Sequence, residues 1–157
     1  MPVVFDNVDI ASELALIDCG DATSYREKLL AVLRRHLAAA KTKIEQDFYR
    51  NNDGSIYVGQ HARCIDDLLI LIHNEAVKLM PQSHDVAVIA VGGYGRGEMA
   101  PFSDIDVMFL MPTKISKQHE TAIEFMLYLL WDLGLKIGHS TRSITEAIAA
   151  GLSLIHI

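Results

Sequence analysis

Apolar residues recur at helical spacing through the first half of the chain. Leucine, isoleucine and phenylalanine follow at intervals of three, four and seven residues over positions 24–50, which predicts one long amphipathic helix. The S-x-x-E pattern that begins at Ser24 is typical of a capping box at its start. Four turn-forming residues, 51–54, are expected to end it. A second apolar stripe over 65–79 predicts another helix, which closes at Pro81.

The hydrophobic pattern then changes from helical spacing to continuous runs. Residues 86–91 are all apolar and rich in β-branched side chains, and two glycines follow them. This pattern predicts a strand that is buried on both faces. Residues 104–111 indicate a second strand of the same kind after their first three positions. The connection between the two strands carries four glycines within six positions, 92–97, so we expect it to have a defined shape.

The remaining pattern indicates a helix over about 116–133, a short strand over 135–138 and a final helix. A capping box that begins at Ser143 is expected to open this last helix, and Gly151 is expected to end it. Helices and strands in this order predict an α/β or α+β fold without an internal repeat. We divide the chain into a helical segment, 1–83, and a core, 84–157, which together form one compact unit.

Composition supports a folded single domain. The chain has 157 residues, of which 50% are hydrophobic and 22% are charged, so disorder is not expected. The net charge of -6 argues against a protein that coats nucleic acid or binds a membrane through basic residues. The longest aliphatic run, 68–72, is too short to span a membrane, and we expect a soluble cytoplasmic protein. Cys19 and Cys64 lack the spacing of a disulfide framework or a zinc site.

Two acidic residues stand at the start of the second predicted strand. Side chains alternate along a strand, so Asp104 and Asp106 share one face while Ile105 turns into the core. Two carboxylates that converge on one face repel each other unless a cation lies between them. Hard divalent ions such as Mg²⁺ take carboxylate oxygens together with substrate phosphates. The pair therefore indicates a metal site, although an Asp-x-Asp pattern can also simply decorate an exposed strand edge.

The glycines upstream of the acidic pair favour a site for phosphate. Directly after a buried strand, Gly92 and Gly93 permit backbone N–H groups to approach an anion closely. A P-loop is rejected because Glu98 and Met99 stand where lysine and serine or threonine are required. The looser dinucleotide pattern is weak because residues 101–103 leave no room for the long helix that holds the pyrophosphate. Phosphate binding beside two carboxylates is the arrangement for metal-assisted phosphoryl or nucleotidyl transfer.

The string VGGYGRGEMAPFSDID at 91–106 resembles the polymerase-β-type nucleotidyltransferases, and most closely their bacterial PII uridylyltransferase/uridylyl-removing branch. The likeness continues through LLWDLGLKIGHS at 129–140 and more faintly through 63–69. It implies a polymerase-β-like fold with a mixed sheet, preceded by long N-terminal helices. It also implies transfer of UMP from UTP to a tyrosine of the PII signalling protein, with Mg²⁺ as cofactor and release of pyrophosphate.

The resemblance also implies roles for particular residues. Asp104 and Asp106 would hold the metal and act in catalysis. Nucleotide contacts would come from four residues: Gly92, Gly93, Arg96 and Ser103. Of these, Arg96 could instead simply pair with Glu98. Apart from the resemblance, the position of His139 near the third predicted strand makes it the one histidine that could line the nucleotide pocket.

Two departures from the family accompany the resemblance. The family completes its metal site with a third carboxylate on a later strand, which we expect beyond the end of this chain, so the core should be C-terminally incomplete. The hydrolase and glutamine-sensing domains of the longer family members do not fit into 157 residues. An adenylyltransferase that acts on another acceptor remains an alternative, because no motif here encodes the base. A non-catalytic nucleotide-binding fragment is the other alternative.

Overall fold

The computed structural model describes residues 7–17 and 20–155, so Cys19 lies outside the described residues. Helices and strands alternate in the second half of the chain, and the predicted α/β class with a mixed sheet is confirmed. The elements in chain order are α1 (Asn7–Ala15), α2 (Ala22–Asn51), α3 (Gly54–Leu79), the 3-10 helix η1 (Pro81–Asp85), β1 (Ala87–Ala90), α4 (Gly92–Gly95), β2 (Ile105–Met111), α5 (Lys117–Asp132), β3 (Ile137–Ser143) and α6 (Ile144–Ile155).

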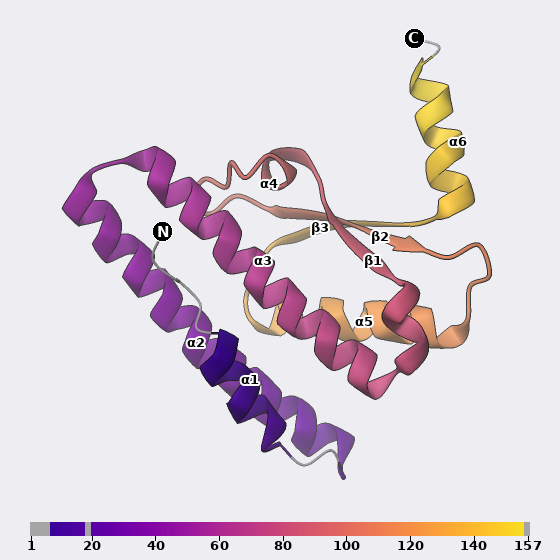
Figure 1. Cartoon of the computed structure of the whole chain (residues 1–157), viewed down its shortest axis with the longest axis horizontal. Coiled ribbons are helices and arrows are strands. Elements are labelled where there is room, and N and C mark those ends of the chain that lie inside the picture. Colours follow the sequence, from indigo (N-terminus) through magenta and orange to yellow (C-terminus); the bar gives the residue numbers. More distant parts are fainter. Residues whose placement is uncertain (1–6, 18–19, 156–157) are drawn as a thin grey trace.

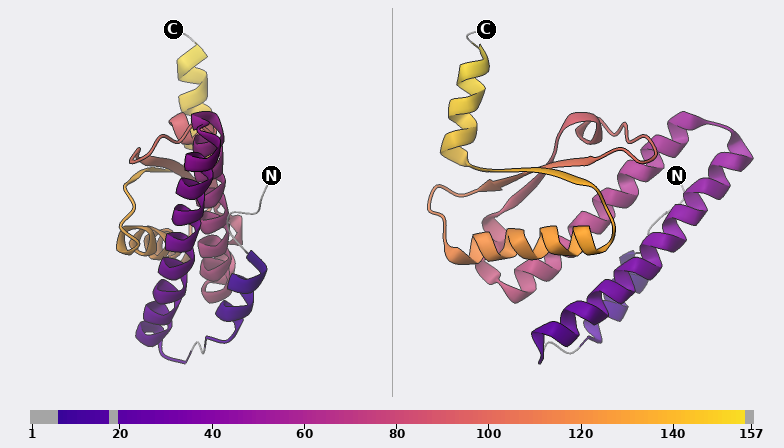
Figure 2. Two further views of the ribbon diagram at one scale, coloured as in Figure 1. Left: turned by 90° about the vertical axis from the view of Figure 1, so that its left-hand side faces the viewer. Right: turned by 180° about the vertical axis from the view of Figure 1, so that it is seen from behind.

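The sheet has three strands in the order β1-β2-β3. β1 pairs with β2 in the antiparallel sense, and β2 pairs with β3 in the parallel sense through the crossover helix α5. Helices α3 and α5 lie together on one side of the sheet, and the long helix α2 packs along α3 (Figures 1 and 2). Helix α6 leaves the end of β3 and points away from the other helices (Figure 1). One side of the sheet is therefore covered by helices.

The central strand β2 shows which of its faces is covered. Its residues alternate between buried and half-buried, and the buried set faces the helices: Ile105, Val107, Phe109 and Met111. Our prediction of strands buried on both faces is therefore wrong. Ala87 of β1 is exposed and the next three residues are only partly buried. The physical reason is that, in the described part of the chain, β1 pairs with β2 alone and no helix covers the second face.

The two long helices begin at aspartate caps. The Asp21 carboxylate accepts a hydrogen bond from the Ser24 N–H at 2.8 Å, so the capping box predicted at Ser24 does not form and the helix begins earlier. Helix α2 ends as predicted, at Asn52 in the left-handed conformation with φ 51°. Asp53 then caps α3 by accepting from the N–H groups of Ser55 and Ile56. This cap starts α3 well before the apolar stripe from which it was predicted.

The last two elements are longer than predicted. β3 spans Ile137–Ser143 rather than 135–138, because it pairs with β2 in register along its whole length. The capping box at Ser143 is confirmed: its N–H and hydroxyl both donate to Glu146, whose N–H donates back to the Ser143 hydroxyl at 3.2 Å. Helix α6 continues through Gly151, which does not end it.

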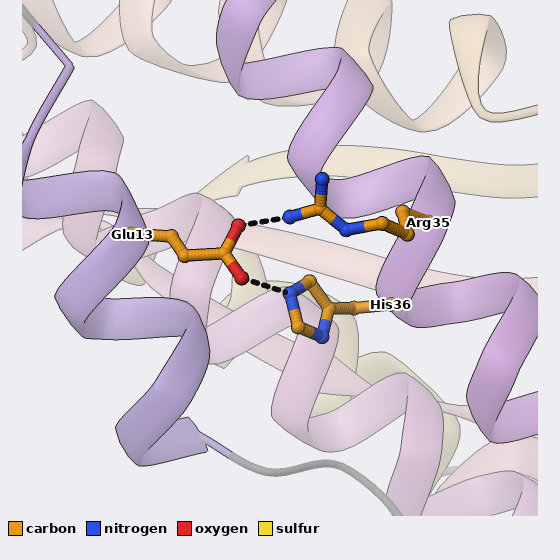
Figure 3. Close-up of polar contacts among 3 residues, drawn as sticks. All are labelled: Glu13, Arg35 and His36. Carbon is orange, nitrogen blue, oxygen red and sulfur yellow. Dashed lines mark hydrogen bonds and ion pairs between the residues drawn. The ribbon is translucent and has the colours of Figure 1, made fainter.

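Helix α1, which the sequence pattern did not reveal, is tied to α2 by a charged cluster. Arg35 and His36 of α2 both reach Glu13 of α1, and the His36 Nε2 to Glu13 Oε1 distance is 3.1 Å (Figure 3). The hydrogen bond from His36, together with the nearby Arg35 charge, holds the pKa of Glu13 below its usual value. Across the described ranges, no helix combines the length and apolarity needed to cross a membrane.

Candidate functional site

The two aspartates lie at the start of the central strand, as the alternation of side chains predicts. Asp104 immediately precedes β2 and is exposed, whereas Asp106 is half-buried within it. Ile105 between them is only 2% exposed and faces the helices. The two carboxylates therefore belong to the face of the sheet that α3 and α5 do not cover.

The Asp106 carboxylate is enclosed by two glycines from different parts of the chain. Gly138 of β3 is its register partner, and a Cβ atom added there would lie 2.2 Å from Asp106 Oδ1. A Cβ atom added to Gly92 would lie 3.0 Å from Asp106 Oδ2. Gly92 also has a φ of +61°, which L side chains rarely adopt. The carboxylate therefore occupies space that side chains at both positions would fill, and the sequence analysis missed Gly138.

The glycine-rich segment folds into a compact turn at the end of β1, and we call residues 91–98 the glycine turn. Its start is bonded to the acidic strand, because the Val91 N–H donates to the Asp106 carbonyl at 3.0 Å. Gly95 lies against the end of β1, where an added Cβ atom would lie 2.7 Å from the Ala90 carbonyl oxygen. The Glu98 N–H returns to the Gly93 carbonyl at 3.0 Å and closes the turn. The structure therefore brings Gly92, at the start of this turn, to the Asp106 carboxylate.

The other two predicted nucleotide contacts have partners of their own. Arg96 Nε lies 3.1 Å from Glu98 Oε2, and both side chains are about two-thirds exposed. This is the local pairing left open in the sequence analysis, and an exposed pair of this kind is easily exchanged for a ligand. The Ser103 hydroxyl donates to the Ala100 carbonyl at 2.8 Å and shapes the turn that leads into Asp104.

His139 does not join the acidic pair. It pairs in register with Val107, so the alternation of β3 places it on the opposite face from Asp106. There its ring lies 6.0 Å from the ring of Trp131 on α5, in an edge-on arrangement. The expectation that His139 lines the nucleotide pocket therefore has no support in the arrangement of the sheet.

Tyr94 connects the glycine turn to α3. Its side chain is only 5% exposed, and its hydroxyl donates to Asp66 Oδ1 at 2.6 Å. Burial raises the pKa of Tyr94 far above its usual value, and the bond to Asp66 raises it further. The phenol therefore stays protonated and keeps its hydrogen-bond donor. Both residues lie within the strings that carry the resemblance, 63–69 and 91–106, but no local pattern in those strings predicts their contact.

The donor atoms of the acidic pair fit Mg²⁺. The ion takes one or two carboxylates from a protein and completes its shell with water and substrate phosphates. Within the described residues, no group of three or more histidine, cysteine, aspartate or glutamate side chains is arranged to hold a metal. Asp104 and Asp106 at the start of β2 are the pair of oxygen donors predicted to hold the ion.

Known proteins resemble the chain over most of its length. The sequence pattern of the family described as "Nucleotidyltransferase domain" matches residues 70–152. Proteins named "Bifunctional uridylyltransferase/uridylyl-removing enzyme" from Rhodospirillum rubrum, Rhodopseudomonas palustris and Gluconobacter oxydans are 38%, 37% and 40% identical to the chain. These alignments cover 82%, 92% and 78% of this chain, but only 14%, 16% and 13% of the respective relatives. No solved structure gives a significant match.

Proposed function

We propose that the chain transfers UMP from UTP to a tyrosine hydroxyl of the PII signalling protein. The premise is that the chain belongs to the nucleotidyltransferase domain family. The family membership rests on the match over residues 70–152. The nucleotide is proposed from the name of these relatives, which describes them as uridylyltransferases. The PII acceptor is proposed from the resemblance of residues 91–106. A cytoplasmic location is proposed from the two cysteines, which lack the spacing of a disulfide framework.

One observation carries the proposal: the Asp106 carboxylate lies between Gly92 and Gly138, directly beside the glycine turn. Space around this carboxylate is kept free by two residues that come from different elements. An acidic residue placed there for solubility alone would not require glycine at both positions. A carboxylate that binds a metal beside a phosphate does require open space on its free side.

The residues of the chain would act mainly by binding and orientation. Asp104 and Asp106 would hold Mg²⁺, which supplies positive charge to the triphosphate and to the attacking oxygen when it is bound. The backbone of Gly92 and Gly93 would contact the phosphates. Arg96 would exchange Glu98 for a phosphate oxygen, and Ser103 would keep Asp104 in place through its bond to the Ala100 carbonyl. We therefore assign no protein nucleophile.

The transfer balances without a further reactant. A bond forms between the acceptor tyrosine oxygen and the α-phosphorus of UTP, and the bond from that phosphorus to the bridging oxygen breaks. Pyrophosphate leaves with the electron pair of that bond, and the tyrosine proton passes to solvent. The reaction therefore needs only UTP, the acceptor and the divalent cation.

A transfer assay tests this function. The chain is incubated with Mg²⁺, α-labelled UTP or ATP, and PII protein, and the label on PII is measured. The Rhodospirillum rubrum relative serves as a positive control, and a PII variant with phenylalanine at the acceptor tyrosine serves as a negative control. We expect label from UTP on the tyrosine-containing PII alone, and we expect Asp106→Asn to abolish it.

The other outcomes identify the alternatives. Label from ATP and not from UTP would replace the proposal with an adenylyltransferase. Binding of UTP without transfer, while the control enzyme labels PII, would identify a non-catalytic nucleotide-binding domain. Transfer that persists in Asp106→Asn would contradict the assigned site.

A further inference from the structure

A hydrogen bond joins the middle of the glycine turn to a helix that is remote in the sequence. The Tyr94 hydroxyl donates to Asp66 Oδ1 at 2.6 Å across a separation of 28 residues. We propose that this bond positions the glycine turn beside Asp106, so that Tyr94 and Asp66 act as positioning residues for the bound nucleotide. The inference rests on the proposed function, because it assigns these residues to the same site.

Hydrogen bonds within the backbone of the glycine turn hold its shape. They do not fix its position relative to the rest of the protein. The N–H groups of Gly95, Gly97 and Glu98 all donate to carbonyls within residues 91–97. Gly92 and Gly97 both have positive φ angles, 61° and 70°. Glycine has the widest choice of backbone conformation, so these two positions are natural hinges. A contact from outside the turn is needed to place its middle.

Contacts from outside reach the turn at its start and near its middle. At its start, the Val91 N–H donates to the Asp106 carbonyl on β2. Near its middle, Gly95 lies against the end of β1, where an added Cβ atom would lie 2.7 Å from the Ala90 carbonyl oxygen. Also near the middle, the Tyr94 side chain reaches Asp66 on α3. This hydrogen bond to α3 falls between the two hinge glycines and ties the turn to a helix that is remote in the sequence.

An open pocket lies beside this contact. It has a volume of about 420 Å³ and lies between α3 and β1, and both Asp66 and Tyr94 belong to its wall. Two apolar side chains of α3, Leu69 and Ile70, contribute to the same wall. Side chains do not fill this pocket, so the hydrogen bond between Tyr94 and Asp66 fixes a distance here that packing alone does not.

The hydroxyl of Tyr94 and the carboxylate of Asp66 can form a strong hydrogen bond. Hydrogen bonds from a hydroxyl to a carboxylate are shorter and stronger than those between neutral groups. Phenylalanine at position 94 would retain the packing of the ring and lose only the donor. Asparagine at position 66 would retain an oxygen acceptor at Oδ1, whereas alanine would not. These three substitutions therefore separate the bond from the packing around it.

The test combines hydrogen exchange with nucleotide binding on the full chain. Amide exchange of residues 92–98 is measured in wild type, Tyr94→Phe, Asp66→Asn, Asp66→Ala and the double variant Tyr94→Phe/Asp66→Ala. Titration calorimetry then gives the affinity for UTP with Mg²⁺. Tyr49→Phe is the matched control, because it removes the same hydroxyl from a tyrosine that is 82% exposed on α2.

We expect Tyr94→Phe and Asp66→Ala each to raise exchange in the turn and to weaken UTP binding, each by about tenfold. The double variant should fall no further than the stronger single variant, because both remove the same bond. Asp66→Asn should recover part of the affinity through its remaining acceptor. A purely structural role would lower the unfolding temperature and leave the UTP affinity of the folded protein unchanged.

The outcomes separate this inference from the proposed function. If wild type binds UTP and Tyr94→Phe binds it equally well with unchanged exchange, the positioning role is wrong and the function stands. If wild type does not bind UTP or ATP, the proposed function is wrong, and the nucleotide role of Tyr94 is overturned with it. The exchange rates would then still show whether the bond to Asp66 orders the turn.

Discussion

Replacing Gly138 by alanine places one methyl group against the Asp106 carboxylate. The added Cβ atom would lie 2.2 Å from Asp106 Oδ1, whereas real Cβ atoms essentially never approach another heavy atom within 3.0 Å. The oxygen therefore has to move by about 0.8 Å before the contact becomes tolerable. On the other side of the carboxylate, a Cβ atom at Gly92 would already lie only 3.0 Å away, so this glycine also limits where the carboxylate can go.

The effect of Gly138→Ala should be small on folding and large on binding. Asp106 can relieve the contact by turning its side chain away from its preferred rotamer, which costs about 1 kcal/mol. Displacing a ligand or reacting group by about 1 Å can lower activity by about 10²-fold. Alanine within a strand gains about 0.5–1 kcal/mol over glycine, which offsets most of this cost. We therefore expect the free energy of unfolding to change by less than about 1 kcal/mol. The affinity for UTP with Mg²⁺ should fall about 10²-fold, which corresponds to about 2.7 kcal/mol.

Chemical denaturation and titration calorimetry on the same protein samples measure the two effects. Gly59→Ala is the matched control: Gly59 lies within α3, where an added Cβ atom meets nothing within 4 Å. Alanine there should stabilise the protein by about 0.5–1 kcal/mol without changing UTP affinity. Gly138→Ala with wild-type UTP affinity would refute the reasoning that the glycine keeps the Asp106 carboxylate free.

Two further predictions concern titratable side chains on α3. Burial raises the pKa of the Cys64 thiol to about 12. Cys64 should therefore resist iodoacetamide at pH 8 in the folded protein and react with it once guanidinium has unfolded the chain. Labelling of the native protein at Cys64 would contradict this. Burial and the Lys41 charge lower the pKa of His61, so below about pH 6.5 the unfolded chain binds more protons there than the folded one. The free energy of unfolding should therefore fall as the pH drops from 7.5 to 5.5, and it should fall less in His61→Gln. Parallel curves of unfolding free energy against pH for the two proteins would contradict this.

Local patterns in the sequence were enough to predict most elements and the placement of the acidic pair. The placement of Asp104 and Asp106 on one face follows from alternation along a single strand, which needs no knowledge of distant residues. The end of α2 at residues 51–54 follows in the same way from turn-forming side chains. The start of α2 was harder, because Asp21 and Ser24 are both good caps and lie within one turn of each other.

Contacts between residues that are distant in the sequence could not be predicted from local patterns. Gly138 meets Asp106 only because α5 returns the chain beside β2 in a particular parallel register. The contact between Tyr94 and Asp66 likewise depends on how α3 packs beneath β1. The partial exposure of β1 depends on the number of its neighbours in the sheet, which a continuous apolar run does not specify.

The most direct test of the central claim is the binding of UTP to the aspartate pair. UTP and ATP are titrated into wild type, Asp104→Asn and Asp106→Asn by calorimetry, with and without Mg²⁺, and circular dichroism verifies that each variant is folded. We predict that wild type binds UTP only when Mg²⁺ is present and that either substitution removes this binding. UTP binding that persists without the metal, or in folded variants that lack either carboxylate, would contradict the assignment of the site.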